Sequence, residues 1–192
     1  MPGYAYAILV AGWLTWVAPF LLNLRGLARP KSLDRRARWG ILLVAVAYSI
    51  LLQGKFWERQ PSTMRVVTST AFFLLAAVLS WTATTALGHQ WRIDAGLNPD
   101  HELVMTGPYR WVRHPIYTSM LGVLLASGLM VSSWWLLLIS FLVFMAGTEI
   151  RVRIEDLARL PFWGKIQGIQ EEGAGLHSIH EVARKRLCGV GK

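Results

Sequence analysis

Five long apolar runs constrain the fold of this chain more than any other feature of its sequence. They cover approximately residues 4–24, 39–54, 66–87, 116–131 and 134–147. An apolar helix of roughly 20 residues crosses the hydrocarbon core of a bilayer. Lipid offers the backbone no hydrogen-bonding partner, so a spanning segment is helical unless it belongs to a closed barrel. The sequence therefore predicts an all-α, polytopic integral membrane protein with about five transmembrane helices.

The composition agrees with a membrane protein. Hydrophobic residues make up 54% of the chain and charged residues 16%, whereas a soluble domain carries about 25% charged residues. A net charge of +9 would also suit nucleic-acid binding. The cations lie in segments between apolar runs, however, where they orient a membrane protein and meet anionic lipid. We therefore expect membrane lipid, and no nucleic acid, as a partner.

The basic loops predict the orientation of the helices. Residues 25–38 hold six cations against one anion, and residues 55–65 hold three cations. The positive-inside rule places the more basic loop in the cytoplasm. With five spans, the N-terminus then lies outside, and the loop 88–115 and the C-terminal tail lie on the cytoplasmic side.

Polar residues within and between the apolar runs predict how the helices join. Only Ser132 and Ser133 separate the last two runs, which should form an antiparallel helical hairpin. The third run carries hydroxyl side chains that can bond to their own helix or across to a neighbour. They are Thr68, Ser69, Thr70, Ser80, Thr82, Thr84 and Thr85.

The segment GPYRWVRHPIYTSMLG, residues 107–122, places rings and cations directly against the fourth apolar run. A charge at the bilayer centre costs about 2.5–3.5 kcal/mol, so such groups beside a span suggest a functional site. Pro115 suits the first turn of a helix, with Arg113 and His114 at its mouth. The start of a helix favours an anionic group such as a carboxylate.

The same residues also suit a simpler interpretation. Cations and aromatic rings are enriched at the level of the lipid headgroups, where they act as interfacial anchors. The residues concerned are Tyr109, Arg110, Trp111, Arg113, His114 and Tyr117.

A second charged cluster, EIRVRIED, follows the fifth run at residues 149–156. On a continuing helix Arg151 and Glu155 are four residues apart and share a face. One interpretation is a solvated helix end with internal salt bridges. The other is a cation and a carboxylate directed at the same pocket as His114.

These motifs resemble the isoprenylcysteine carboxyl methyltransferase family, whose broader kin include phospholipid N-methyltransferases. The resemblance rests on HELVMTGPYRWVRHPIYTSM, a hydrophobic hairpin and then RVRIED, and covers about residues 87–156. The first two runs match only as generic membrane helices. We expect no Rossmann-type cofactor loop of the soluble methyltransferases, which fits a family that lacks a Rossmann domain.

The resemblance implies S-adenosylmethionine as cofactor, with S-adenosylhomocysteine as product. Arg151 would bind the substrate, because its planar fork suits a carboxylate, and Glu155 would bind the cationic amino group of the cofactor. These two would be the catalytic residues. The further cofactor-binding residues would be His101, Glu102, Leu103, Val104, Tyr109, Arg113, His114, Pro115, Ile116 and Tyr117. No metal is expected, since the pair His177 and His180 has no further ligands beside it.

Two features depart from the family. Ser119 stands where the motif has glycine, and the tail, residues 157–192, lacks the pattern FG-x-x-Y/F-x-x-Y and the Val-Pro segment that follows it. Read one base later, with permitted codons of our choice, residues 161–180 can encode that pattern. We therefore expect one transmembrane methyltransferase domain over residues 1–156 and an atypical tail, for which a frameshift after about Asp156 is our hypothesis.

The methyl acceptor should be lipophilic and resident in the membrane. The resemblance implies the carboxylate of an isoprenyl cysteine, and a phospholipid amine or a small thiol stays open. Proteins of another class would also fit the apolar runs: a non-catalytic membrane protein, a transporter, or a membrane reductase of similar helical layout.

Overall fold

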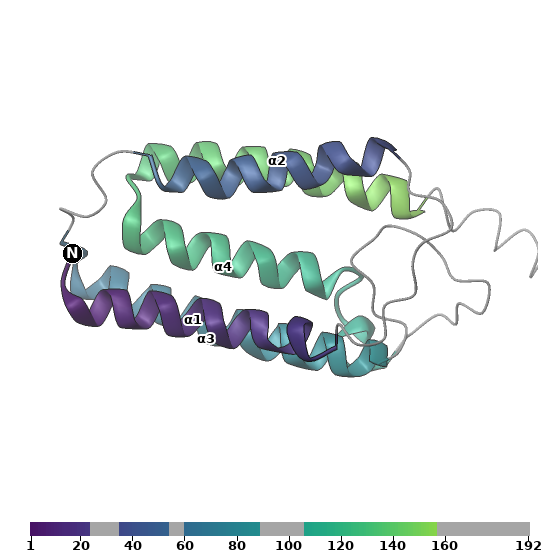
Figure 1. The fold of residues 1–192 in the computed structure, drawn as a ribbon, viewed down its shortest axis with the longest axis horizontal. Coiled ribbons are helices and arrows are strands. Elements are labelled where there is room, and N and C mark those ends of the chain that lie inside the picture. Colours follow the sequence, from purple (N-terminus) through teal and green to yellow (C-terminus); the bar gives the residue numbers. More distant parts are fainter. Residues whose placement is uncertain (24–34, 54–59, 89–105, 157–192) are drawn as a thin grey trace, which may run out of the picture. The chain divides into compact units, whose positions relative to one another are not determined.

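The computed structural model describes residues 1–23, 35–53, 60–88 and 106–156. Within these ranges the chain forms five α-helices and a short 3₁₀ helix, and no strand. The prediction of an all-α protein is confirmed (Figure 1). In chain order the elements are α1 (Gly3–Leu22), α2 (Arg35–Leu51), α3 (Thr63–Leu87), η4 (Gly107–Arg110), α4 (Pro115–Val131) and the last helix (Trp134–Asp156).

Three of these helices are long and apolar enough to cross a membrane: α1, α3 and the last helix. Two shorter apolar helices accompany them, Arg38–Leu51 within α2 and α4. At 1.5 Å per residue, a helix of 17 residues is about 25 Å long and stands at the lower limit for a span. The described helices thus agree with a polytopic membrane protein.

Turn residues of the sequence set the ends of the helices. The side chain of Ser62 accepts a hydrogen bond from the backbone N–H of Arg65 at 3.5 Å and caps the start of α3. Asn23 Nδ2 donates to the carbonyl of Pro19 at 2.7 Å and satisfies the end of α1. Between α4 and the last helix, Ser132 Oγ donates to Leu51 O at 2.6 Å. The two-serine connection expected to form a hairpin therefore also fastens the end of α2.

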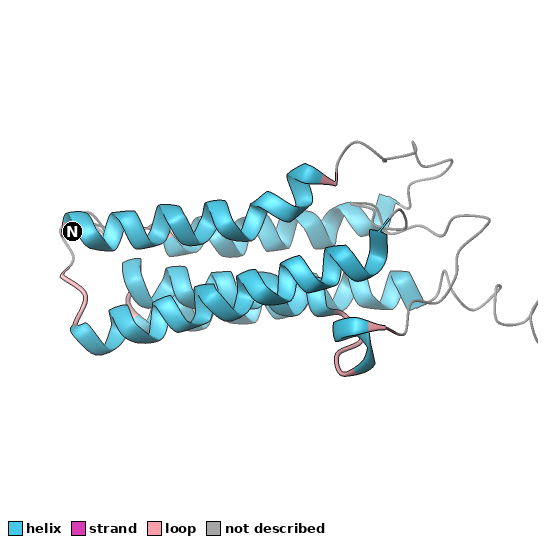
Figure 2. Cartoon of the chain, turned by 90° about the horizontal axis from the view of Figure 1, so that it is seen from below, coloured by secondary structure: helices cyan, strands magenta, loops and turns pink. Residues whose placement is uncertain are grey.

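The helix α4 lies between two pairs of helices. Figure 1 shows α2 and the last helix on one side of α4 and α1 with α3 on the other, and Figure 2 shows the helices, in cyan, from below. Among α1, α2, α3, η4 and α4, the most extensive packing is between α4 and α3, and α1 packs mainly on α3. The first turn of α4 is therefore within reach of side chains from several helices.

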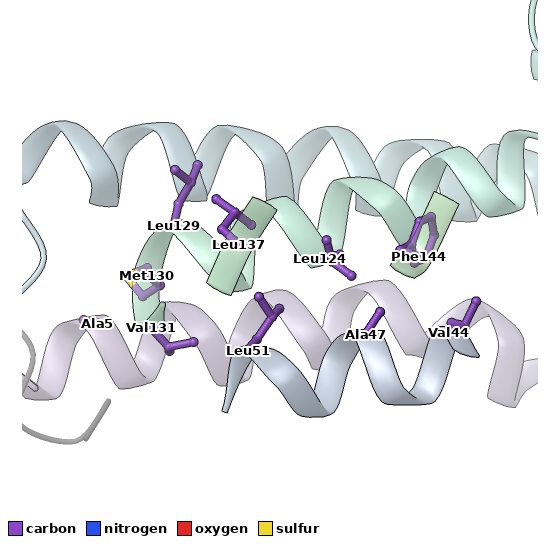
Figure 3. Packing of buried hydrophobic residues seen from close by; sticks show 10 residues of the cluster. All are labelled: Ala5, Val44, Ala47, Leu51, Leu124, Leu129, Met130, Val131, Leu137 and Phe144. Atoms are coloured by element: carbon purple, nitrogen blue, oxygen red, sulfur yellow. The ribbon is translucent and has the colours of Figure 1, made fainter. Parts of the chain in front are cut away.

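A core of apolar side chains joins α1, α2, α4 and the last helix, and Figure 3 shows ten of its residues. Phe144, Leu51, Leu124 and Met130 are among the largest fully buried side chains. Large apolar side chains also cover the outside of the bundle, such as Leu75, which is 67% exposed. An outer surface this apolar suits contact with lipid rather than water.

The hydroxyl groups of α3 form both kinds of hydrogen bond expected from the sequence. Ser69 Oγ donates across to Ala126 O of α4 at 2.7 Å, and Ser80 Oγ donates to Trp16 O of α1 at 3.2 Å. Other hydroxyls donate to carbonyl oxygens one turn back in α3, and these belong to Thr70, Thr82, Thr84 and Thr85. The inward serines therefore fix α3 to its neighbours.

The chain divides into two compact units, Met1–Ile154 and Glu155–Lys192. The tail, residues 157–192, lies outside the described residues, as do residues 25–34 of the expected basic loop 25–38. The last four residues of that loop belong instead to α2, which begins at Arg35. The single methyltransferase domain over residues 1–156 and the frameshift therefore stay predictions.

Candidate functional site

The first turn of α4 is built from the motif that the sequence singles out. Pro115 is the first residue of the helix and is fully buried. The backbone N–H of Thr118 donates to His114 O at 3.1 Å, which closes the first turn. The backbone N–H groups at a helix start lack partners within the helix and carry partial positive charge. This turn therefore offers an electrostatic environment that suits a carboxylate.

Arg151 of the last helix meets the motif at this turn. Its Nε donates to the hydroxyl of Tyr117 at 2.9 Å, and its guanidinium carbon lies 5.4 Å from the centre of the Tyr117 ring. The Tyr117 ring stacks in turn on His114, with ring centres 5.8 Å apart and planes 30° apart. Arg151 thus forms one cluster with Tyr117, which is 34 residues earlier in the chain, and with His114. We call it the Arg151 cluster.

A close crossing of helices supports the stem of Arg151. A Cβ atom added to Gly40 of α2 would lie 2.5 Å from Arg151 Cγ and 2.8 Å from Gly147 O. A Cβ atom added to Gly147 would lie 2.9 Å from Gly40 O. Small residues let membrane helices approach backbone to backbone. The two glycines thus bring α2 against the last helix and leave room for the Arg151 side chain beside Gly40.

The two interpretations of the charged cluster at residues 149–156 apply to different arginines. Arg153 Nε pairs with Glu149 Oε1 at 2.7 Å, and both side chains are exposed. This is the solvated helix end with an internal salt bridge. Arg151 donates to Tyr117, as the interpretation with a shared pocket requires.

The residues of the motif at 107–122 also fall into two groups, one exposed and one at least partly buried. Trp111 is 83% exposed, Arg110 and Arg113 are exposed, and the Arg110 guanidinium carbon lies 5.9 Å from the Trp111 ring centre. These residues fit the interfacial anchors of the simpler interpretation. His114, Pro115 and Tyr117 are instead at least partly buried, so they are the stronger candidates for a site.

The other residues predicted to bind the cofactor lie outside the Arg151 cluster, in several parts of the chain. Tyr109 is partly buried in η4, which packs on α3. Ile116 is partly buried in the first turn of α4. Glu155 lies in the last turn of the last helix, within the second unit of the chain. His101, Glu102, Leu103 and Val104 lie outside the described residues. Their roles stay predictions.

An open groove lies between the end of α3 and η4. Its lining consists of Trp81, Thr82, Thr85, Ala86, Thr106, Gly107 and Pro108. Among the described residues, its lining includes no member of the Arg151 cluster and no predicted cofactor residue, so the groove alone does not define a cofactor site.

Two residues that join the site to the rest of the bundle were not expected from the sequence. Trp16 Nε1 donates to Ser119 Oγ at 3.1 Å, and the hydroxyl of Tyr48 donates to Met120 O at 2.7 Å. The sequence does not distinguish a tryptophan or tyrosine that donates a hydrogen bond to another helix from one that only packs in the core or at the interface. No local signal could have identified them.

The comparison with known families decides which group of proteins this chain resembles. The model described as "Isoprenylcysteine carboxyl methyltransferase (ICMT) family" matches residues 69–159. The matched residues make up just under half of the chain. This match confirms the resemblance seen in the sequence, and it includes α4, the last helix and the Arg151 cluster.

The name of a curated relative gives no information on activity. "Uncharacterized protein YpbQ" of Bacillus subtilis (strain 168) is 26% identical over 110 residues, which are 57% of this chain and 65% of that protein. The chain thus covers just under two thirds of the length of this relative. No solved structure matches the chain.

Proposed function

We propose that this protein transfers a methyl group from S-adenosylmethionine to a lipophilic acceptor in the membrane. The observation that carries the proposal is the Arg151 cluster at the start of α4, because it lies within the ICMT-family domain and joins the two motifs of the resemblance. A carboxylate of isoprenylcysteine type is the acceptor that the family name favours.

The described residues fit one end of the cofactor. The first turn of α4 suits the carboxylate of its methionine part. The rings of Tyr117 and His114 offer faces to a sulfonium, and a cation over an aromatic face gains about 0.5–2 kcal/mol. In this proposal Glu155 binds the ammonium group, and His101 to Val104, with Tyr109, complete the binding site.

When bound, S-adenosylmethionine supplies the methyl group from its sulfonium. Methyl transfer is an in-line displacement, so the protein accelerates it mainly by positioning the two reactants and excluding water. Arg151 is suited to orient an acceptor carboxylate, because its guanidinium can bind both oxygen atoms. Such an acceptor needs no general base, whereas an amine acceptor would have to be deprotonated first.

The surroundings of the cluster support an acceptor that arrives through the bilayer. The helices that carry it have apolar outer faces, and exposed Trp39 and Trp111 lie at the start of α2 and just before α4. Tryptophan is enriched at the membrane interface. The positive-inside rule favours the cytoplasmic side for this end of α4.

Calorimetry on the purified full chain in detergent or nanodiscs, with S-adenosylhomocysteine as probe, tests cofactor binding. We expect the wild type to bind and Glu155→Ala to bind more weakly. Transfer of a tritiated methyl group is then measured to three acceptors: an N-blocked S-farnesyl cysteine, phosphatidylethanolamine and a small thiol. We expect the farnesyl cysteine to be methylated.

Arg151→Ala should abolish transfer to the carboxylate, and Arg153→Ala is its matched control. Arg153 is two residues away on the same helix, but it is exposed and paired with Glu149. If the wild type does not bind the probe, the proposed function is wrong. If it binds the probe but methylates only the amine or the thiol, the family is right and the acceptor is wrong.

A further inference from the structure

The first two turns of α4 receive one side-chain hydrogen bond from each of three other helices. Arg151 Nε of the last helix donates to Tyr117 at 2.9 Å, Trp16 Nε1 of α1 to Ser119 at 3.1 Å, and the Tyr48 hydroxyl of α2 to Met120 O at 2.7 Å. No charged group takes part in the last two bonds. Their effect on a ligand would therefore be indirect, through the position of the helix start.

The bond from Trp16 continues into the first turn. Ser119 Oγ accepts from Trp16 and donates its own proton to Ile116 O at 2.7 Å. The Ser119 side chain is fully buried and Trp16 is 9% exposed. Water cannot replace a buried hydrogen bond that is broken, so leaving one donor without a partner costs its full desolvation energy. The two bonds thus link α1 to the backbone of the turn that carries His114 and Tyr117.

A second bond of the same kind provides a comparison within the same pair of helices. Trp13 Nε1 of α1 donates to Ser127 Oγ of α4, also at 3.1 Å. Ser127 is 6% exposed, but it lies eight residues beyond Ser119, or about 12 Å farther along the helix. Both bonds attach α1 to α4, and only the first reaches the turn of the Arg151 cluster.

We propose that Trp16 and Ser119 are positioning residues: their buried hydrogen bond holds the first turn of α4 in the orientation that binds the cofactor. The inference rests on the proposed function and deepens it. It concerns a feature of this chain, because Ser119 stands where the motif of the resemblance has glycine, which has no hydroxyl group. Ser119 and Trp16 touch no ligand in this proposal, and they act through the backbone of Ile116.

The test compares Ser119→Ala with Ser127→Ala in the full chain, in nanodiscs. Each change removes one hydroxyl group and leaves one tryptophan N–H without its partner, so both should lower the thermal stability. For S-adenosylhomocysteine measured by calorimetry, we expect Ser119→Ala to raise Kd about threefold to tenfold, the scale of one hydrogen bond. Ser127→Ala should leave Kd within about twofold of the wild type. Trp16→Phe should reproduce the effect of Ser119→Ala.

Hydrogen exchange of the amides of Thr118, Ser119 and Met120, measured without ligand, makes the result independent of the proposed function. We expect exchange there to be faster in Ser119→Ala than in Ser127→Ala. Equal Kd values in the two variants, or equal exchange at these amides, would overturn the inference. If the wild type does not bind the probe, the proposed function fails, and exchange alone decides whether the bond orders the turn.

Discussion

At the scale of single residues, the candidate site depends on where each arginine of the last helix places its guanidinium. Arg151 and Arg153 are two residues apart, and the sequence offers both the same choice between a salt bridge and a partner on another helix. Successive helical residues point about 100° apart, so residues two positions apart point to nearly opposite sides of the helix. Only one of the two arginines can therefore face the bundle. Arg151 faces Tyr117 of α4, and Arg153 faces Glu149 at the surface.

Tyr117→Phe tests the bond between Tyr117 and Arg151. The change removes the hydroxyl that accepts from Arg151 Nε and keeps the ring beneath the guanidinium. A hydrogen bond to a charged group contributes about 1.5 kcal/mol or more, so we expect the free energy of unfolding to fall by about that amount. Denaturation in detergent micelles measures it.

Tyr4→Phe is the control for this change, because Tyr4 is 57% exposed near the start of α1. It should change the stability by less than about 0.5 kcal/mol. The same small effect for Tyr117→Phe would show that the bond to Arg151 does not stabilise the fold.

At the scale of elements, the close crossing of α2 and the last helix places Arg151 in reach of α4. The atoms nearest to a Cβ atom at Gly147 are Gly40 O, Leu43 Cβ and Val44 N. Two of these belong to the backbone of α2 and cannot rotate away. Any side chain at Gly147 therefore separates the two helices.

Gly147→Ala should destabilise the protein by about 2 kcal/mol, as expected when a group is forced into a packed interface. It should also weaken methyl transfer, because Arg151 lies one turn farther along the displaced helix. Thermal unfolding and the transfer assay measure the two effects.

Gly3→Ala is the matched control, since a Cβ atom there meets no atom within 4 Å. It should leave both stability and transfer close to those of the wild type. Equal stability of Gly147→Ala and Gly3→Ala would contradict the close crossing.

At the scale of the whole molecule, the two ends of α4 should lie on opposite sides of the membrane. Thr106 precedes the motif and is exposed, and Ser133 lies in the connection after α4. The positive-inside rule places Thr106 on the cytoplasmic side and Ser133 outside. Single cysteines at these positions, in a Cys188→Ser background, report this orientation.

A membrane-impermeant maleimide should label Ser133→Cys in right-side-out vesicles and Thr106→Cys only in inverted vesicles. Labelling of both from the same side would mean that α4 does not span the bilayer. The opposite pattern would mean that the orientation is reversed, with the cluster outside.

The tail leads to a prediction about the gene rather than the fold. The family match ends at residue 159, close to where the sequence departs from the pattern of the resemblance. Under the frameshift hypothesis, sequencing the coding DNA should reveal a second frame that encodes FG-x-x-F/Y followed by Val-Pro. If no frame encodes it, the hypothesis is wrong.

The sequence by itself determined the class of fold, the approximate ends of the helices and the resemblance to a family. Lipid forces each apolar run into a helix that satisfies its own backbone, so this outcome depends on local composition. Pro115, Ser62 and Ser133 set helix ends through contacts within a few residues. The loop motif, the hydrophobic hairpin and RVRIED, in that order along the chain, carried the resemblance.

Only the tertiary structure decided which members of the motifs meet. Trp16 and Ser119 are 103 residues apart in the chain, and no local pattern distinguishes this pair from other polar groups in apolar runs. The choice of Arg151 over Arg153, and the pairing of Gly40 with Gly147, follow from how the helices rotate and cross. That rotation depends on the packing of all five helices at once, because a buried polar group finds its partner only where neighbouring helices bring one close.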